Sequence, residues 1–568
     1  MAHLTTQPQL LATAAADAAE IEAVIGAATA AAAGPTSSLA AAAQDEVSAV
    51  TAALFGAYGQ EYQALLHQAA AFHDQFVAKL AAAGNAYAQA EAQIAGTLGL
   101  TGTSASPLAA VTQVADPTVD AILLMSGSGA ATPPQNLMQD AYNLYLTNFN
   151  TLPSTVLTAV STAEGLYPFT GVKDLTLDIS LARGVTALDN AITSVLGPAP
   201  SAKVVSVFGV SQSAIIASME MPKLLAEGYS SSNAFFTLIG DPSNPNGGLL
   251  ARFPGVSVPS LGITFGVSTP SNDFPTTIWT LEYDGFADFP RYPIDFFADL
   301  NALAGISYVH GNYLNVTPSQ LASALLLPGS HTLDPTNGLT DYYMIPTDNL
   351  PLLAPLRALP VIGNPLADLV QPDLKLLVNW GYGDPNFGWS TSPANVQTPI
   401  GFLPPLSATT ELGSLLPGAT AQGVNAFVND LSTLLPTAAS SGGVALTLPP
   451  SASIPTTLTG FIQGIEAANT NVVRTLTTDF STAYATLLPT ADIATAVVVT
   501  LPSYDVNLFL NGITEAINGN PVQGLTDAFG LPIAADVGLT TLAGGFELIV
   551  LENAFGTILT GAPHPGPF

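Results

Sequence analysis

The stretch KVVSVFGVSQSAIIASM, which runs from Lys203 to Met219, decides how the middle of this chain is expected to fold. Its first half, Val204 to Phe208, is rich in β-favouring residues, and the part that begins at Ala214 is apolar and compatible with a helix. The segment GVSQS lies between them, so the pattern predicts a strand, a sharp turn and a helix, with Ser211 at the apex. Such a turn offers the serine hydroxyl to a base on one side and to a substrate carbonyl on the other.

The short motif alone is a weak signal, because the pattern G-x-S-x-[GS] occurs four times in this chain. The other copies begin at Gly102, Gly228 and Gly388, and none of them has a strand before it and a helix after it. Only Ser211 has the local context that nucleophilic catalysis needs. The alternative interpretation is a buried strand–turn–helix whose serine merely satisfies backbone groups.

Composition limits the classes of function. The 568 residues predict two or three domains, and 48% hydrophobic residues with a mean hydropathy of +0.41 provide ample surface to bury. Ten Lys and Arg against 41 Asp and Glu give a formal charge of −31, which argues against nucleic acids and against electrostatic binding to anionic membranes. Without cysteine, no disulfide, thiolate nucleophile or cysteine-ligated metal is available. We expect no metal and no cofactor.

The sequence start gives no general secretory signal, because MAHLTTQPQLL lacks a basic region ahead of an apolar core. No run of 18 uninterrupted apolar residues occurs, so we expect no transmembrane segment. Alanine-rich sequence from Gln9 to Ala33 stops at Gly34-Pro35 and resumes to about residue 95, which predicts two antiparallel helices. Apolar residues recur at three- and four-residue steps along the second helix. Such a stripe requires a partner, either another helix pair or the rest of this chain.

This first segment resembles the PE domain of mycobacterial PE/PPE proteins over its whole length. The runs AAAAGPTSSLAAAAQDEVSAVTAALFGAYGQEYQAL and AAAFHDQFVAKLAAAGNAYAQAEA carry the resemblance, although the name-giving Pro-Glu is here Pro8-Gln9. Tyr87 and Glu91 match the family's Y-x-x-x-[DE] export signal. The resemblance implies export by type VII secretion machinery to the cell envelope or beyond, and a PPE protein as partner of the PE helices.

The middle of the chain supplies candidates for an oxyanion hole. Residues 121–125 read as a buried strand that ends in the glycine-rich loop Ser126 to Gly129. An α/β hydrolase places one oxyanion donor in such a loop and the other on the backbone N–H after the nucleophile, here Gln212. We therefore predict that Gly127, Ser128 and Gln212 form the hole. A plain turn or a phosphate loop is the alternative, but the net charge and the lack of a following G-K-[ST] argue against phosphate.

Histidine is the usual base for a serine nucleophile, and the chain has six. Three lie in the N-terminal segment and one lies in the last five residues, which leaves His310 and His331 for a site in the middle domain. His310 follows an apolar run and precedes a glycine, whereas His331 lies in a polar loop. We prefer His310. The alternative is a structural histidine bonded to backbone.

The orienting carboxylate is expected between the serine and the histidine, just past the end of a strand. Residues 277–281 read as that strand and lead into EYDGFADFP. Both Asp284 and Asp288 are candidates. We favour Asp288, deeper in the loop, and keep Asp284 as the alternative acid or as a partner behind it. Either could instead cap a turn or the helix that residues 295–303 predict.

These same residues resemble the PE-PPE domain, a serine-hydrolase module, over roughly residues 120–385. The runs GVSQS, EYDGFADFPRYPIDFFADLNALAGISYVHGNY and TDYYMIPTDNLPLLAPLR carry this resemblance. It implies an α/β-hydrolase fold similar to cutinases and lipases, activity on esters, Ser211 as nucleophile, His310 as base and an aspartate of the YDGFADFP segment as the orienting acid. Where the family has a second glycine in the elbow, this chain has Ser213.

We therefore expect an α/β protein with a PE hairpin (1–95), a linker (96–119), a PE-PPE hydrolase domain (120–400) and a mostly helical tail (401–568). Residues 374–381 read as the last strand of the hydrolase domain. For the tail, packing on the hydrolase core is favoured over a lid or lipid-contacting surface. The leading function is an exported serine esterase or lipase. The alternative is a non-catalytic protein of the cell surface.

Overall fold

The computed structural model describes residues 117–151, 157–438 and 485–560, with isolated positions at 33, 470 and 481–482. The chain divides into two compact units, Met1–Gln113 and Val114–Phe568, and all elements below belong to the second. The expected PE hairpin, with Tyr87 and Glu91, and most of the expected linker lie outside the described residues. So does the copy of the serine motif at Gly102.

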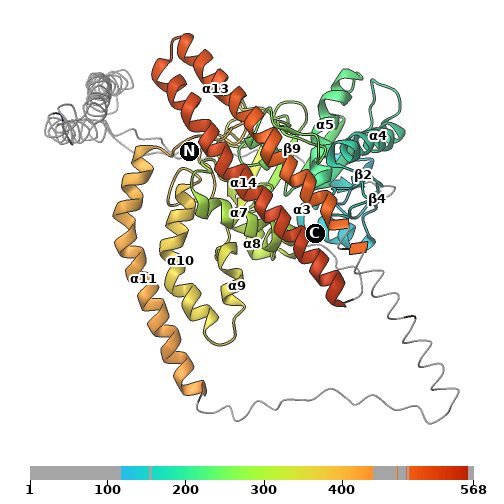
Figure 1. The fold of residues 1–568 in the computed structure, drawn as a ribbon. Helices are drawn as coiled ribbons and strands as arrows, with labels where there is room; N and C mark the ends of the chain where they lie inside the picture. Colours follow the sequence, from blue (N-terminus) through green and yellow to red (C-terminus); the bar gives the residue numbers. More distant parts are fainter. Residues whose placement is uncertain are drawn as a thin grey trace, which may run out of the picture. The chain divides into compact units, whose positions relative to one another are not determined.

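A seven-stranded sheet in the order β10-β11-β9-β6-β5-β2-β4 forms the centre of this unit (Figure 1). Every pair of neighbours is parallel except β10 and β11. The strands are β2 (Ala121–Leu124), β4 (Leu157–Ala159), β5 (Val205–Val210), β6 (Ala234–Ile239), β9 (Thr276–Leu281), β10 (Leu325–Leu326) and β11 (Thr340–Ile345). The chain moves outward from β2 to β4 and then returns to β5 and moves the other way. In open α/β sheets, ligands bind at the carboxyl ends of the strands beside such a reversal.

Both faces of the sheet are covered, which explains why its central strands read as nearly continuous apolar runs. On one face, strand residues such as Leu123 and Val207 share a core with α4 (Leu177–Leu196) and α5 (Gln212–Ala226). On the other face, Leu124 and Phe208 pack with α3 (Gln135–Tyr145) and the 3-10 helix η1 (His310–Asn315). This layered arrangement is that of an α/β hydrolase, as the sequence predicts.

The helix expected after Asp295 is present as α7 (Phe296–Tyr308). The Asp295 carboxylate caps its first turn by accepting hydrogen bonds from the backbone N–H groups of Phe297, at 3.1 Å, and Ala298, at 3.4 Å. Short elements complete the domain: β1 (Thr118–Val119), β3 (Asn150–Thr151), α6 (Leu249–Arg252), β7 (Ser257–Val258), β8 (Ile263–Thr264), α8 (Pro318–Ala322), η2 (Pro351–Leu353) and α9 (Ala354–Arg357).

The prediction of a last strand at residues 374–381 is wrong, because this run lies in α10 (Gly363–Trp380). A short apolar run does not distinguish a strand from a helix by its pattern alone. The strand that ends the series is β11, which carries two tyrosines and pairs with β9. Lys375 of α10 donates to the Thr347 carbonyl at 3.3 Å, and its Nζ lies 5.8 Å from the Tyr283 ring centroid.

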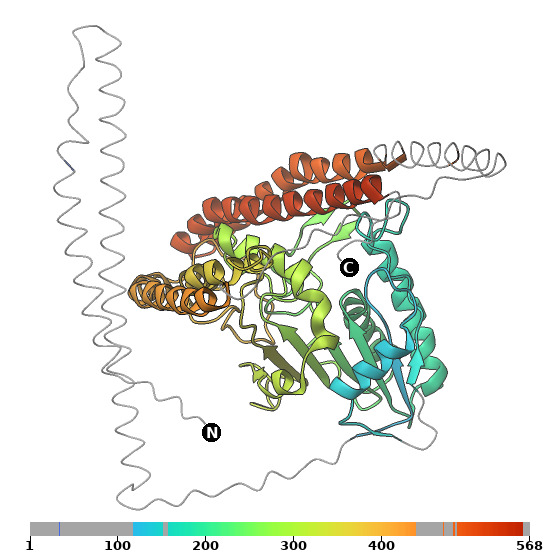
Figure 2. The same ribbon diagram turned by 90° about the horizontal axis from the view of Figure 1, so that it is seen from below.

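The tail is helical where it is described. Helix α11 (Leu406–Ala438) runs beside α10, and α13 (Leu501–Ile517) runs beside α14 (Pro521–Thr560), as Figure 2 shows. A π-helical turn, η3 (Ala496–Thr500), leads into α13. We refer to residues 485–560 as the C-terminal hairpin. Within the expected helical tail, most of residues 439–484 lie outside the described residues.

The C-terminal hairpin packs closely on itself and on the hydrolase domain. A Cβ added at Gly512 of α13 would lie 2.3 Å from the Ala528 backbone nitrogen of α14. One added at Gly545 of α14 would lie 2.6 Å from the Leu303 side chain of α7. The helical spans Ala485–Ile517 and Pro521–Ile558 are also long and apolar enough to cross a membrane by length and composition alone, a test that core helices of soluble proteins pass as well. The expectation of no transmembrane segment therefore stays a prediction.

Candidate active site

Ser211 occupies the sharp turn between β5 and α5 that the sequence predicts. Its backbone has φ 56° and ψ −119°, a conformation that non-glycine residues rarely adopt and that marks strained functional turns. Gly209 permits this turn, because a Cβ there would lie 2.8 Å from the Ser213 carbonyl oxygen. Ser213 is fully buried, and its hydroxyl accepts from Val210 N–H at 2.8 Å and donates to Val210 C=O at 3.0 Å. The residue in place of the second glycine thus closes the turn.

His310 lies against this serine. Its Nε2 atom is 2.8 Å from Ser211 Oγ, and the side chain is only 8% exposed. The residue begins η1, directly after α7, and the Phe286 ring stands edge-on to the imidazole at a centroid distance of 4.8 Å. Gly240, at the end of β6, leaves room for the ring, since a Cβ there would lie 3.2 Å from His310 Cε1. The structure therefore brings together the two residues that sequence reasoning paired.

Asp284 holds the other side of the imidazole. His310 Nδ1 lies 2.8 Å from Asp284 Oδ2 and 2.9 Å from Oδ1, and this carboxylate is fully buried. It also accepts from Phe286 N–H at 3.0 Å and from the Tyr313 hydroxyl at 2.6 Å. Because a carboxylate accepts hydrogen bonds, the imidazole proton belongs on Nδ1, which leaves Nε2 as the acceptor for the Ser211 hydroxyl.

The preference for Asp288 as the acid on His310 is therefore corrected in favour of Asp284. The loop folds back on itself after β9, since Asp288 N–H donates to Asp284 C=O at 2.6 Å. Asp288 Oδ2 consequently points to the Tyr283 N–H, at 3.0 Å, and away from the histidine. Tyr283 has a positive φ of 68°, so Asp288 fixes the turn that carries Asp284.

Asp288 lies in a buried environment of its own. Burial raises its pKa well above the ordinary value, and the Tyr283 N–H and the charge of Arg252 only partly offset this. The Arg252 side chain is fully buried as well and donates to the carbonyls of Phe289, at 3.0 Å, and Thr398, at 2.6 Å. Burial lowers the pKa of Arg252 to about 10. The hydrogen bond from Tyr283 N–H and the nearby Arg252 charge give Asp288 a structural role in this loop.

Sequence reasoning missed Tyr313, which follows His310 by three residues on η1. Its hydroxyl donates to Asp284 Oδ2 at 2.6 Å and accepts from Leu281 N–H at 3.0 Å. Burial and the nearby Asp284 charge raise the pKa of Tyr313 well above its usual value, so the hydroxyl keeps its proton and remains a donor. The one sequence signal was that Tyr313 lies three residues after His310 in HGNY. This spacing does not reveal where the tyrosine hydroxyl points.

The predicted oxyanion residues surround the serine. A Cβ added at Gly127 would lie 3.2 Å from Ser211 Cβ, so the loop after β2 touches Ser211 through a glycine. Within the described residues, the backbone N–H groups of Gly127, Ser128 and Gln212 donate to no protein acceptor. The Ser128 hydroxyl donates to Gln212 Oε1 at 2.8 Å, so it orients that side chain rather than standing ready for a substrate oxygen. The Gln212 amide in turn donates to Ser180 Oγ at 2.7 Å.

A cavity opens beside Ser211, with about 600 Å³ of space between atoms, part of it open to solvent. We call it the serine cavity. Apart from Ser128, Ser211 and Gln212, its lining is apolar: Leu166, Phe169, Leu177, Ile215, Pro242, Leu249, Leu250, Ile263, Phe265, Phe286 and Phe546. An apolar pocket with a few convergent polar groups is the usual form of a small-molecule site.

The other candidates from the sequence lie elsewhere. His331 precedes β11, and its backbone N–H donates to the Thr340 carbonyl of that strand at 2.9 Å. The histidine on the Ser211 hydroxyl is His310 instead. Of the other serine motifs, Ser230 Oγ bonds Asn233 Oδ1 at 2.9 Å, and Ser390 follows no strand. In the part of the chain that the structure describes, only Ser211 has a histidine on its hydroxyl.

Two protein-family models match separate parts of this chain. The PE family model matches residues 4–94, and the PE-PPE domain model matches residues 153–383. Esterase PE16 of Mycobacterium tuberculosis is 41% identical over 426 residues, which cover 74% of this chain and 76% of that protein. PE family protein PE3 of the same organism is 40% identical over 439 residues, 76% of this chain and 90% of that protein.

A PPE family protein of the same organism, PPE28, is 46% identical over 441 residues, which cover 77% of this chain and 66% of that protein. Among solved structures, a cutinase-like protein from Cryptococcus sp. matches 30% of this chain and 79% of its own, at 17% identity and a TM-score of 0.20. That TM-score is too low for the likeness to inform the site.

Proposed function

Since the chain belongs to the PE family of mycobacterial proteins and carries a PE-PPE domain, we propose that it is an exported serine ester hydrolase of the esterase or lipase class. The observation that carries this proposal is the contact chain from Ser211 Oγ through His310 to Asp284, with bonds of 2.8 Å on both sides of the imidazole. A nucleophile, a base and an orienting acid within hydrogen-bonding reach are what acyl transfer needs.

The reaction follows from this geometry. His310 Nε2 takes the proton of Ser211 as Oγ bonds to the ester carbonyl carbon, and Asp284 stabilises the resulting imidazolium. The backbone N–H groups of Gln212 and of the Gly127–Ser128 loop hold the carbonyl oxygen as it becomes negative. Each such donor lowers the barrier by about 3 kcal/mol.

The tetrahedral intermediate then loses its alcohol. The carbon–oxygen bond to the alcohol breaks, and His310 returns its proton to that leaving oxygen, which leaves an acyl group on Ser211. In the second half, His310 takes a proton from water as the water oxygen attacks the acyl carbon. The bond to Ser211 Oγ breaks, Oγ regains a proton from His310, and the carboxylic acid departs.

The export part of the proposal rests on the family and on the sequence of the N-terminal segment, which the structure does not describe. The PE resemblance and the pair Tyr87 and Glu91 support transport by type VII machinery, with a PPE protein bound to the PE helices. The site of action would then be the cell envelope or the medium.

Hydrolysis of p-nitrophenyl esters by the purified full-length chain tests the catalytic part. Ser211→Ala removes the attacking atom, so kcat/KM is expected to fall at least about 10⁴-fold. Ser230→Ala, in the motif copy without a histidine, is the matched control and is expected to match the wild type. Full activity in Ser211→Ala would end the proposal, and a wild type with no activity on any ester would favour a non-catalytic surface protein.

A further inference from the structure

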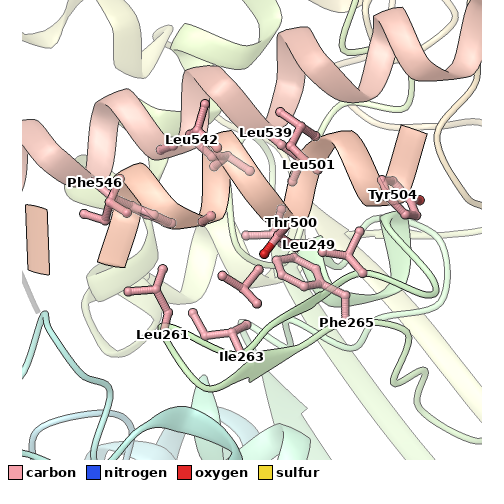
Figure 3. A pocket seen from close by; sticks show the side chains of 16 residues that line it. Leu249, Leu261, Ile263, Phe265, Thr500, Leu501, Tyr504, Leu539, Leu542 and Phe546 are labelled. Carbon is pink, nitrogen blue, oxygen red and sulfur yellow. The ribbon is translucent and has the colours of Figure 1, made fainter. Parts of the chain in front are cut away.

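A second cavity lies between the hydrolase domain and the C-terminal hairpin, and we call it the hairpin cavity (Figure 3). It holds about 640 Å³ of space between atoms, part of it open to solvent. One wall comes from the domain: Leu249, Val256, Val258, Leu261, Ile263 and Phe265. The other comes from the hairpin: Ile493, Ala496, Val497, Thr500, Leu501, Tyr504, Leu539, Leu542, Ala543 and Phe546.

The lining of the hairpin cavity is almost wholly apolar. Among the described residues that line it, only Thr500 and Tyr504 have polar side-chain atoms, and Tyr504 directs its hydroxyl to the Pro254 carbonyl at 3.4 Å. None of the described residues that line it is charged. An occupant of this space therefore has no ionic partner and gains its affinity from burying apolar surface.

The two cavities adjoin. Four residues line both of them: Leu249, Ile263, Phe265 and Phe546. Phe546 of α14 also stacks edge-on against Phe169 of the serine cavity, with ring centroids 4.7 Å apart. Apolar space thus extends from Ser211 toward the hairpin, and it is lined by side chains of both the hydrolase domain and the hairpin.

The hairpin wall is held to the domain by polar contacts as well as by packing. Asp492 accepts a hydrogen bond from the Tyr167 hydroxyl at 2.6 Å, and its carbonyl accepts from Ser260 Oγ at 2.9 Å. Leu542 and Ala535 of α14 belong to the same buried core as the sheet. These contacts therefore fix the hairpin in place as one wall of the cavity.

The position of the base decides which part of an ester enters. The serine cavity is lined on its polar side by Ser128, Ser211 and Gln212, whereas His310 does not line it. The leaving alcohol must depart beside His310 Nε2, which returns the proton to it. The part of the substrate that stays on Ser211 therefore faces the serine cavity and, beyond it, the hairpin cavity.

We propose that the hairpin cavity binds the distal part of a long acyl chain, so that the C-terminal hairpin sets the acyl-length preference of the enzyme. This inference rests on the proposed ester hydrolase function and names its substrate class, the esters of long-chain fatty acids. A short acyl group ends within the serine cavity and does not reach the hairpin cavity. Each buried methylene of a longer chain contributes to binding, by about fourfold in kcat/KM.

The test compares a butanoyl with a dodecanoyl p-nitrophenyl ester on the full-length chain. Ala543→Trp and Val497→Trp fill the hairpin cavity from two helical segments, at positions that are only partly buried, so both variants are expected to fold. If about three methylenes can no longer be buried there, the dodecanoyl-to-butanoyl ratio of kcat/KM falls about 60-fold. Leu548→Trp is the matched control, since Leu548 lies on α14 and is 65% exposed. It is expected to keep the wild-type ratio.

Labelling adds a readout that does not require turnover. Alkyl fluorophosphonates with ethyl and dodecyl chains phosphonylate the serine, because Oγ bonds to phosphorus as fluoride leaves, and the dodecyl probe is expected to label the wild type faster. Ala543→Trp should lose that preference, whereas Leu548→Trp should keep it. A third ester, dodecyl acetate, carries its long chain on the alcohol, and its hydrolysis should be insensitive to Ala543→Trp.

The outcomes separate this inference from the proposed function. Loss of all labelling in Ser211→Ala with unchanged length ratios in both tryptophan variants would overturn the hairpin cavity as an acyl site and leave the hydrolase standing. Sensitivity of dodecyl acetate alone would overturn the acyl assignment. Unaltered ester hydrolysis by Ser211→Ala would instead overturn the proposed hydrolase function.

Discussion

Two aspartates of one loop, Asp284 and Asp288, share full burial but have different partners. Asp284 accepts from a histidine, a tyrosine and a backbone N–H, and the Nε2 atom of that histidine meets Ser211 Oγ. Asp288 accepts from the Tyr283 N–H and lies within the field of the buried Arg252. Burial of a carboxylate in a hydrolase loop therefore does not identify the catalytic acid, because the direction of the chain after the strand decides what each side chain meets.

The largest effect that would sharpen this comparison comes from replacing one of the two carboxyl groups at a time by an amide. Asp284→Asn keeps the shape but favours the wrong histidine tautomer, and kcat on p-nitrophenyl butanoate is expected to fall about 10⁴-fold. Asp288→Asn keeps an acceptor for Tyr283 N–H, so kcat should fall less than about 10-fold. Circular dichroism of both variants controls for folding. Equal losses, or a larger loss in Asp288→Asn, would reverse the assignment.

The sequence anticipated the parts of the site that local chain geometry determines. A β-favouring run, a glycine and an apolar helical run predict the turn at Ser211, and the small number of histidines in the middle domain points to His310. The choice of aspartate was wrong because it depends on a positive φ at Tyr283 and on a loop that folds back, and neither leaves a clear pattern in EYDGFADFP. Partners that approach from distant segments, such as the hairpin wall, leave no local signal either.

A smaller effect is expected at Tyr313, which distinguishes Asp284 further from Asp288. Tyr313→Phe removes a donor to Asp284 and leaves Leu281 N–H without its acceptor. Stability is expected to fall by about 1–3 kcal/mol in urea unfolding. Because Asp284 keeps His310 and Phe286 N–H, kcat should fall only about 10-fold. A wild-type kcat in Tyr313→Phe would show that the hydroxyl serves the fold alone.

The smallest effect concerns a third buried carboxyl, that of Glu164, whose backbone carbonyl accepts from the Gly129 N–H of the loop after β2 at 2.8 Å. Burial raises the pKa of Glu164 from 4.5 to about 8. Because the folded-state pKa is the higher one, its stability contribution is full below about pH 4.5 and is lost as the pH rises through 8. The melting temperature should therefore fall between about pH 4.5 and 8, and by roughly 2 °C less in Glu164→Gln. Parallel curves for the two proteins would contradict this.

The most direct measurement is to locate the adduct of a fluorophosphonate probe by peptide mapping, in the wild type, His310→Ala and Asp284→Asn. A single adduct on the peptide that contains Ser211, strongly reduced in both variants, is the predicted result, since the hydroxyl is reactive only while an oriented imidazole takes its proton. No adduct on Ser211, or equal labelling of that serine without His310, would contradict the account.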